Sequence, residues 1–346
     1  MAGSAVSVIK VEDIAHLRFR VPDLHTLQRF LVDFGLDSWV AEDRVLYGRG
    51  RDGVPFNYSA EEGPPAFCGI GLRADGMGAL EQLSAAEGKP IEVLNAPGGG
   101  RVVRLTDPDG VLVEVVAGQL RTKPDALKRE PARNSALDKG RLGTPVRLEP
   151  GPATVIRLGH CVMNVSDFRV SERWYKERFG FITSDEIEAS PGVSMGAFMR
   201  CDRGDALTDH HTLFLAQLPQ KTGFMHGAYE VSGFDDLMLG HAYLKATKRD
   251  AVWGVGRHVL GSQIFDYWKD PWGHELEHWT DGDLFTAKDG SNCASVADLL
   301  NVQWGMQSPV LSGRLAPSSR LVGFALGLNL KLRRWFRRSS KRAGDR

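Results

Sequence analysis

The sequence predicts an α+β protein built from two related modules. Each half opens with a stretch that alternates like a strand and continues into a stretch with helical spacing. Each half also closes with a turn followed by a strand that carries a glutamate. The order of strand, helix and then several strands favours an α+β fold over a doubly wound parallel sheet. A duplicated unit is the economical explanation of these parallels.

The first module is expected over residues 1–120. Its opening strand covers Ile14–Val21, where apolar and polar residues alternate. The helix that follows covers Leu24–Phe34 and ends at Gly35, because glycine readily adopts the left-handed conformation that closes a helix. Near the end of the module, Asp107–Glu114 (D-P-D-G-V-L-V-E) predicts a turn and then a strand.

The second module is expected over residues 153–300, after a linker at 121–152. The linker is rich in charge, proline and glycine and has no sustained period. The module opens with a strand over Ile156–Val165 and a helix over Asp167–Phe179. A later helix and further strands are expected over Phe234–Lys248, Leu213–Leu215, His226–Val231 and Ser262–Trp268.

The most informative stretch is Gly256–Thr280, G-R-H-V-L-G-S-Q-I-F-D-Y-W-K-D-P-W-G-H-E-L-E-H-W-T. It predicts two strands joined by a tight turn at Asp270–Gly273, where proline presets φ and glycine tolerates a positive φ. Side chains alternate along the second strand, so Glu275 and Glu277 share one face and the two histidines the other. A carboxylate near a tyrosine and a histidine is unusual to bury, and we interpret Glu277 as a metal ligand.

Composition excludes several classes of protein. A chain of 346 residues with 43 basic and 43 acidic side chains can form two ordinary cores and gives no general reason to expect a nucleic-acid partner. The four cysteines are far apart and form no C-x-x-C pair, which fits a reducing cytoplasm rather than a disulfide framework. There is no secretory signal pattern and no window long enough to span a membrane, so we expect a cytoplasmic protein.

Residues 301–346 are expected to form an extension with a basic tail. Arg320–Arg342 has an apolar first half and a strongly basic second half. One interpretation is an interfacial helix drawn to anionic lipid. Two glycines and the lack of a clean amphipathic face favour the other interpretation, an appended helix that packs on a sister subunit.

The candidate metal ligands are His160, His226 and Glu277, each on a predicted strand. Two imidazoles and one carboxylate on one face of an octahedron leave the remaining positions open, as nonheme Fe(II) requires to hold a substrate and dioxygen together. The pattern alone does not single out these histidines, because a strand histidine is commonly an ordinary core or surface residue.

Several sequence motifs of the second half occur in the same order as in a known enzyme family. From Val155 to Asp281 the chain resembles the type I extradiol ring-cleaving dioxygenases of the vicinal oxygen chelate superfamily. L-G-H-C-V-M resembles the strand of the first ligand (His160), M-H-G-A-Y-E-V that of the second (His226), and D-P-W-G-H-E-L-E the family's D-P-x-G-x-x-x-E, which selects Glu277. The resemblance implies modules of paired βαβββ units that form an incomplete barrel around the site. The first half resembles the family's non-catalytic module more loosely.

The resemblance also implies an activity and further site residues. The activity is insertion of both atoms of O2 into a catechol, with ring cleavage beside the diol to give a semialdehyde-type muconate. The cofactor would be Fe(II), and Mn(II) suits the same ligands. His258 and Tyr267 match residues that manage the proton of a catechol oxygen, and His210 matches the acid–base histidine, with its neighbour His211 as the alternative. Family members commonly form homo-oligomers.

The first half retains only part of the ligand set. His16 and Glu114 correspond to His160 and Glu277, but where the second histidine should fall the sequence offers only Cys68. We therefore expect no iron in this module, which would be retained for its fold.

Two alternative functions remain open. One is another metal-dependent enzyme of the superfamily, similar to the 4-hydroxyphenylpyruvate dioxygenases, although such an enzyme has no reason to combine His210, His258 and Tyr267. The other is a non-catalytic protein that binds an aromatic drug between its repeats, which would retain the metal triad only by accident.

Overall fold

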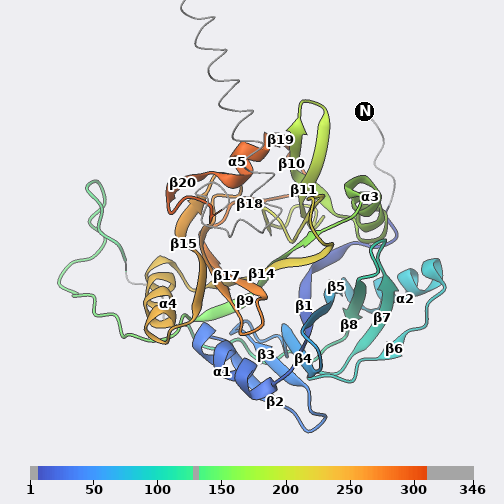
Figure 1. Ribbon diagram of the computed structural model, residues 1–346, viewed down its shortest axis with the longest axis horizontal. Coiled ribbons are helices and arrows are strands. Elements are labelled where there is room, and N and C mark those ends of the chain that lie inside the picture. The colour runs from blue at the N-terminus through green and yellow to red at the C-terminus, as the bar shows by residue number, and fades with distance from the viewer. Residues whose placement is uncertain (1–6, 128–131, 310–346) are drawn as a thin grey trace, which may run out of the picture.

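The computed structural model describes residues 7–127 and 132–309. Their strands form two large sheets, of 8 and 10 strands, and one small two-stranded sheet. The first large sheet uses residues 11–117 and the second residues 155–305, with helices on the outer sides of the sheets (Figure 1). The predicted α+β class is confirmed.

The first sheet has the strand order β2-β3-β4-β1-β5-β8-β7-β6. Its helices are α1 (Leu24–Phe34) and α2 (Gly76–Glu87). Its strands are β1 (Val11–Val21), β2 (Asp37–Val40), β3 (Leu46–Arg49), β4 (Tyr58–Glu62), β5 (Ala66–Ala74), β6 (Glu92–Val93), β7 (Arg101–Thr106) and β8 (Leu112–Ala117).

The second sheet has the order β19-β10-β11-β13-β9-β14-β17-β16-β15-β20. Its helices are α3 (Phe168–Phe179), α4 (Phe234–Ala246) and α5 (Val296–Leu300). Its strands are β9 (Val155–Asn164), β10 (Ile182–Ser190), β11 (Val193–Arg200), β13 (Leu213–Ala216), β14 (Gly223–Val231), β15 (Asp250–His258), β16 (Ile264–Lys269), β17 (Glu275–Thr280), β19 (Asn292–Ser295) and β20 (Val302–Gly305), while β12 (Thr208–Asp209) pairs with β18 (Leu284–Phe285).

One βαβββ unit occurs four times along the described chain. The units begin at β1, β5, β9 and β14, and the last strand of each unit in its large sheet (β4, β8, β13 and β17) pairs in parallel with the first. The first strands of two successive units pair antiparallel at the centre of each sheet, β1 with β5 and β9 with β14. The prediction of two modules, each made of paired units around an open barrel, is confirmed.

Local sequence signals set the helix ends. Asp23 caps α1 by accepting hydrogen bonds from the backbone N–H groups of His25 and Thr26, and Gly35 ends the helix at φ 102°. Asp167 caps α3 in the same way by accepting from the N–H of Val170. The predicted bounds of α1 are therefore those observed, and the other predicted elements of the second module differ by a few residues at their ends.

The two sheets share a hydrophobic core. Leu17 of β1 and Leu158 of β9 belong to one cluster of buried side chains, which spans both modules. His278 fixes the contact further, because its Nε2 donates to the carbonyl of Phe34 at 2.7 Å and its ring stacks on Phe34 at 3.9 Å. Helices α1 and α4 pack against each other on the same side (Figure 1). This packing holds the first module against the second.

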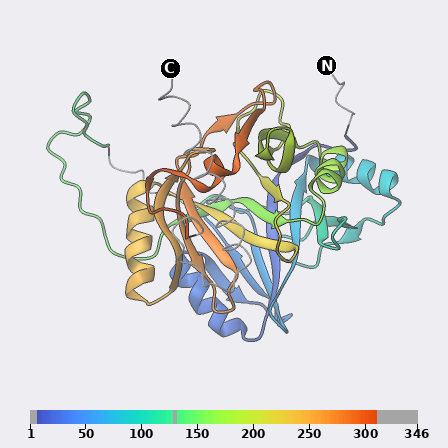
Figure 2. The same cartoon turned by 45° about the horizontal axis from the view of Figure 1, so that its top comes forward.

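The described part of the segment between the modules has little regular structure. Residues 132–150 extend away from both sheets as an arm, which Figures 1 and 2 show from two directions. The predicted domain boundaries stay a proposal, and β20 pairs with β15, so the second sheet continues past residue 300. The predicted basic helix, Arg320–Arg342, lies outside the described residues. Within the described ranges, no helix is long and apolar enough to span a membrane.

Candidate metal centre and its cavity

The register of three strands gathers the predicted ligands on one face of the second sheet. His160 of β9 lies opposite Ala228 of β14, and His226 lies opposite Val162. Residues two apart on a strand share a face, so both imidazoles point to the same side. Glu277 of β17 pairs with Ala228 and projects to that side as well.

The three ligand groups converge. One ligand atom from each of His160, His226 and Glu277 lies within 4.8 Å of the others. Both Nε2 atoms are 3.3 Å from Oε2 of Glu277. His160 and Glu277 are each 1% exposed, whereas the side chain of His226 is 16% exposed, so the centre is buried on one side and open on the other. The geometry fits the predicted two-histidine, one-carboxylate set.

The charges at this centre favour a bound cation. Burial by itself raises the pKa of Glu277, but the surrounding imidazoles of His160, His226 and His258 outweigh burial and hold that pKa well below its usual value. Burial lowers the pKa of His160, which favours the neutral ring that a metal ligand must have. Among the described residues, neither oxygen of Glu277 has a hydrogen-bond partner. A divalent ion would satisfy both the charge and the free oxygen atoms.

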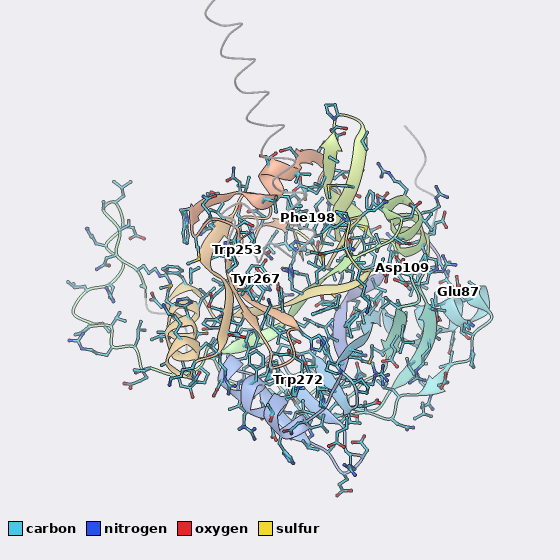
Figure 3. All side chains as sticks on the ribbon, in the orientation of Figure 1. Glu87, Asp109, Phe198, Trp253, Tyr267 and Trp272 are labelled. Atoms are coloured by element: carbon cyan, nitrogen blue, oxygen red, sulfur yellow. The ribbon has the colours of Figure 1, made fainter. Side chains whose placement is uncertain are left out.

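His258 and Tyr267 form a pair beside this centre. Tyr267 lies opposite Glu277 in the β16–β17 pairing, and its hydroxyl is 3.1 Å from Nε2 of His258. Burial, with Glu277 nearby, raises the pKa of Tyr267 well above its usual value, so the hydroxyl keeps its proton. Trp253 stacks on Tyr267 with ring centroids 5.5 Å apart, and Figure 3 shows the two side chains together. The pair offers a hydrogen-bond donor and an adjacent imidazole to a bound ligand.

His210 and His211 point in different directions. The ring of His211 lines the cavity and lies 4.0 Å from that of His160, centroid to centroid. The ring of His210 turns to Asp185, and the contact between its Nε2 and Oδ2 of Asp185 is 2.7 Å. The structure therefore places the ring of His211, and not that of His210, against the cavity. Both residues lie between β12 and β13, where the backbone is irregular and strand periodicity does not tell which side chain faces inward.

A cavity of about 870 Å³ opens at the candidate centre. Its walls include Phe198, Phe214 and Leu299 from the second module, and Phe67 of β5 reaches it from the first. Phe198, Trp253 and Tyr267 all line this cavity and are labelled in the upper half of Figure 3. Most of the wall is apolar, and a pocket of this size accommodates a ligand larger than a single unsubstituted ring.

The remaining histidines of the second module have partners away from the candidate ligands. His241 of α4 contacts the carboxylate of Asp266 at 3.0 Å. His274 contacts Asp270 at 2.7 Å, at the turn before β17, and His278 bonds the first module as described above. They position the elements that carry the site.

The first module replaces the centre by an ion-pair cluster. His16 Nε2 is 2.9 Å from one oxygen of Glu114, and Arg18 and Arg104 bind the other oxygen at 2.8 and 2.9 Å. By register, the position equivalent to His226 is Gly69 and not its neighbour Cys68, because Gly69 pairs with Arg18 as His226 pairs with Val162. Two guanidinium groups thus compensate the carboxylate that a cation would compensate in the second module.

Most of the second module is similar to a known protein superfamily. Residues 157–278 match the Glyoxalase/Bleomycin resistance protein/Dioxygenase superfamily. The second module is thus similar to this superfamily over those residues. The matched residues contain His160, His226 and Glu277, and the resemblance inferred from the sequence motifs is confirmed.

Individual proteins resemble the chain over different lengths. It is 29% identical over 302 residues to Metapyrocatechase 2 of Cupriavidus necator, covering 86% of this chain and 90% of that protein. It is 29% identical over 136 residues to an iron-dependent extradiol dioxygenase of Rhodococcus jostii (strain RHA1), covering 36% of this chain and 43% of that protein. The fold resembles that of the Mn(II)-bound glyoxalase from Novosphingobium aromaticivorans, with a TM-score of 0.71, 23% identity and coverage of 87% of this chain and 93% of that one.

Proposed function

We propose that the protein is a nonheme Fe(II) extradiol dioxygenase that cleaves the ring of a catechol beside its diol. The observation that carries the proposal is the convergence of His160, His226 and Glu277 on one cavity that His211, His258 and Tyr267 also reach. Both atoms of O2 enter the product, which is a semialdehyde-type muconate. The extradiol relatives in other organisms support the proposal.

The metal would be held by His160, His226 and Glu277. When bound, it supplies a centre that holds the catechol and dioxygen side by side and passes electron density between them. One carboxylate and two neutral imidazoles leave a divalent ion with net positive charge, so an anionic catecholate is favoured next to it. The same ligands suit Mn(II).

His258 and Tyr267 would manage the proton of the catechol. A catechol hydroxyl near Tyr267 can pass its proton to the imidazole of His258, which lies 3.1 Å from the tyrosine oxygen. Tyr267 keeps its own proton because its pKa is raised, so it can donate a hydrogen bond to the resulting oxyanion. The two residues would orient the ring as well as remove its proton.

His211 is our candidate for the acid–base residue on the other side of the centre. It lines the cavity next to His160, whereas His210 is directed to Asp185. Burial, with His160 and His210 nearby, lowers the pKa of His211 well below its usual value, so the free ring is neutral. A neutral imidazole that lines the cavity can take up a proton and return it to the oxygen atoms being cleaved.

The substituent on the catechol would be apolar. The cavity of about 870 Å³ is lined by Phe198, Phe214, Trp253 and Leu299, which contribute no charge. Burial of a hydrocarbon group against these four side chains is favourable, while Lys221 also lines the cavity and is the group that could pair with a carboxylate. A catechol with a large hydrocarbon or aryl substituent suits the cavity better than catechol itself.

Oxygen uptake tests the proposal directly. Metal-free protein is loaded with Fe(II) under anaerobic conditions, mixed with catechols that bear no, small, large apolar or carboxylate substituents, and exposed to air. We expect oxygen consumption with a new near-visible absorbance of the ring-opened product, fastest with the large apolar substituents. Loading with Mn(II) in parallel identifies the metal that supports turnover. Protein that retains Fe(II) and consumes no oxygen with any catechol contradicts the proposal.

Two further features belong to the same proposal. The family resemblance implies a homo-oligomer, and the four widely spaced cysteines favour a reducing cytoplasm. Light scattering coupled to size-exclusion chromatography measures the mass in solution, and a mass of one chain contradicts the oligomer.

A further inference from the structure

A buried chain of polar contacts lies directly behind His211. Its Nδ1 atom is 3.1 Å from Nδ1 of His210, and Nε2 of His210 is 2.7 Å from Oδ2 of Asp185. His211, His210 and Asp185 are 3%, 1% and 7% exposed, so little water competes for these contacts. The residues come from β10 and from the segment before β13, 25 positions apart in the chain. Asp185 and His210 have no direct place in the catechol chemistry described above.

The contacts determine which nitrogen atoms carry hydrogen. An ionised carboxylate only accepts, so Nε2 of His210 is the donor to Asp185. In a neutral ring the other nitrogen then has a free lone pair, so Nδ1 of His210 accepts and Nδ1 of His211 must donate. The hydrogen of His211 is thereby placed on Nδ1. Its Nε2 atom is left with a free lone pair on the cavity side of the ring.

The surroundings hold this arrangement in place. The backbone N–H of His210 donates to the carbonyl of Asp283 at 2.9 Å, and its own carbonyl accepts from the hydroxyl of Ser184 at 2.6 Å. The ring also packs against Gly261, where a side-chain Cβ would come within 2.9 Å of Nδ1 of His210. Phe198 lies against both imidazoles, with ring centroids at 5.2 Å from His210 and 4.7 Å from His211. His210 therefore has little freedom to rotate.

We propose that Asp185 and His210 are positioning residues that fix the tautomer and ring orientation of His211. They present its unprotonated Nε2 to the cavity. The importance of this for turnover rests on the proposed dioxygenase function, whereas the tautomer itself does not. Replacement of an aspartate behind a catalytic histidine by asparagine keeps the shape but favours the wrong tautomer, as the serine protease triad illustrates.

Nuclear magnetic resonance of metal-free protein with 15N-labelled histidine tests the tautomer. Long-range 15N–1H correlations distinguish a ring with hydrogen on Nδ1 from one with hydrogen on Nε2, and the variant His211→Asn identifies the signals of His211. We expect the Nδ1–H form in the native protein and a shift toward the Nε2–H form in Asp185→Asn. An Nε2–H form in the native protein overturns the proposal without any variant, so a variant that fails to fold does not decide the question.

Kinetics of the Fe(II)-loaded protein give the second readout. Asp185→Asn is expected to lower kcat by at least about tenfold, with an unchanged Fe(II) content and little change in KM for the catechol. Asp185→Glu should restore part of the rate. Asp205→Asn is the matched control, because Asp205 is exposed and pairs with Lys288 at the surface. Native kcat in Asp185→Asn overturns the positioning role, whereas an Nδ1–H tautomer in a protein that turns over no catechol overturns the dioxygenase function alone.

Discussion

Glu277 and Glu275 lie on the same face of β17, but only Glu277 is a candidate metal ligand. Glu277 is buried between two imidazoles, whereas the side chain of Glu275 is 32% exposed and lies 3.6 Å from Lys269. We expect Glu277→Ala to lower Fe(II) affinity by more than about 100-fold, which exceeds the usual effect of losing an outer contact. Glu275→Ala should retain the metal. Titration of the metal-free proteins with Fe(II) under anaerobic conditions measures both, and equal affinities would show that Glu277 is not a ligand.

The lowered pKa of Glu114 in the first module makes the free energy of unfolding depend on pH. Burial alone raises its pKa, but His16 and the guanidinium groups outweigh it and lower that pKa from 4.5 to about 2. A carboxyl group with a depressed pKa stabilises the fold above its unfolded value, and this stabilisation is lost as pH falls from 4.5 toward 2. The shift corresponds to about 3 kcal/mol at neutral pH and to roughly half of that at pH 3.

Glu114→Gln isolates this contribution because glutamine has no charge to lose. Urea denaturation between pH 7 and pH 3 should show the variant less stable by about 3 kcal/mol at neutral pH. The difference between the two proteins should then shrink as the pH falls. A difference that stays constant across this range would mean that the effect comes from packing rather than from the carboxylate charge.

At the scale of elements, Gly159 of β9 determines how the strand meets β17. A Cβ atom at this position would lie 2.6 Å from the ring of Trp279, which is 2% exposed and cannot move freely. Gly159→Ala is therefore expected to destabilise the metal-free protein by about 1–3 kcal/mol, as overpacked cores do. Gly78 in α2 has open space around it, so Gly78→Ala should stabilise by about 0.5–1 kcal/mol. Urea denaturation compares the two, and destabilisation by both would contradict the packing explanation.

Most elements could be predicted where local signals are strong. The glycines at positions 35 and 180 end α1 and α3, and the Asp270–Gly273 turn joins β16 to β17 as predicted. The motifs that carry the family resemblance also selected the three candidate ligands that the fold brings together, which periodicity alone did not single out. These features depend on residues close together in the sequence, where each residue constrains its neighbours directly.

Long-range contacts and irregular backbone limited the rest of the prediction. The choice between His210 and His211 depends on Asp185 of β10, which no spacing rule connects to them. The residue predicted to correspond to His226 was Cys68, one position away from Gly69, which the strand register identifies. Alignment of motifs does not reveal strand register. The apolar walls of the cavity come from strands and loops far apart in the chain, so only the folded molecule shows them.

At the scale of the whole molecule, the two units of the second sheet are related by an exchange of strands. A rotation that places β9 on β14 and β14 on β9 keeps this pairing. His160 pairs with Ala228 and Val162 pairs with His226, so the rotation places His160 where His226 was, and His226 where His160 was. Glu277 pairs with Ala228 in one unit, and in the other Phe214 of β13 pairs with Val162. Phe214 therefore occupies the position that corresponds to Glu277.

This relation predicts the effect of adding a carboxylate. Phe214→Glu should raise the affinity for Fe(II) or Mn(II) by at least about tenfold, because a buried carboxylate would join the centre. Ring cleavage should be lost, since the added ligand would take a position that the catechol needs. Phe214→Leu, which keeps the site apolar, should bind metal as the native protein does. Calorimetric titration of the metal-free proteins measures the affinities, and equal values for all of them would contradict the relation.

The strand exchange thus has a consequence for the origin of reactivity in this fold. Two equivalent units could enclose an ion with four protein groups, two from each, and leave little room for reactants. Here one unit contributes two groups and the other contributes one, and the aromatic ring of Phe214 faces the cavity where the fourth would be. The two copies of the folding unit differ at this point in one side chain, Phe214 in place of a glutamate. This difference is what keeps a bound metal accessible.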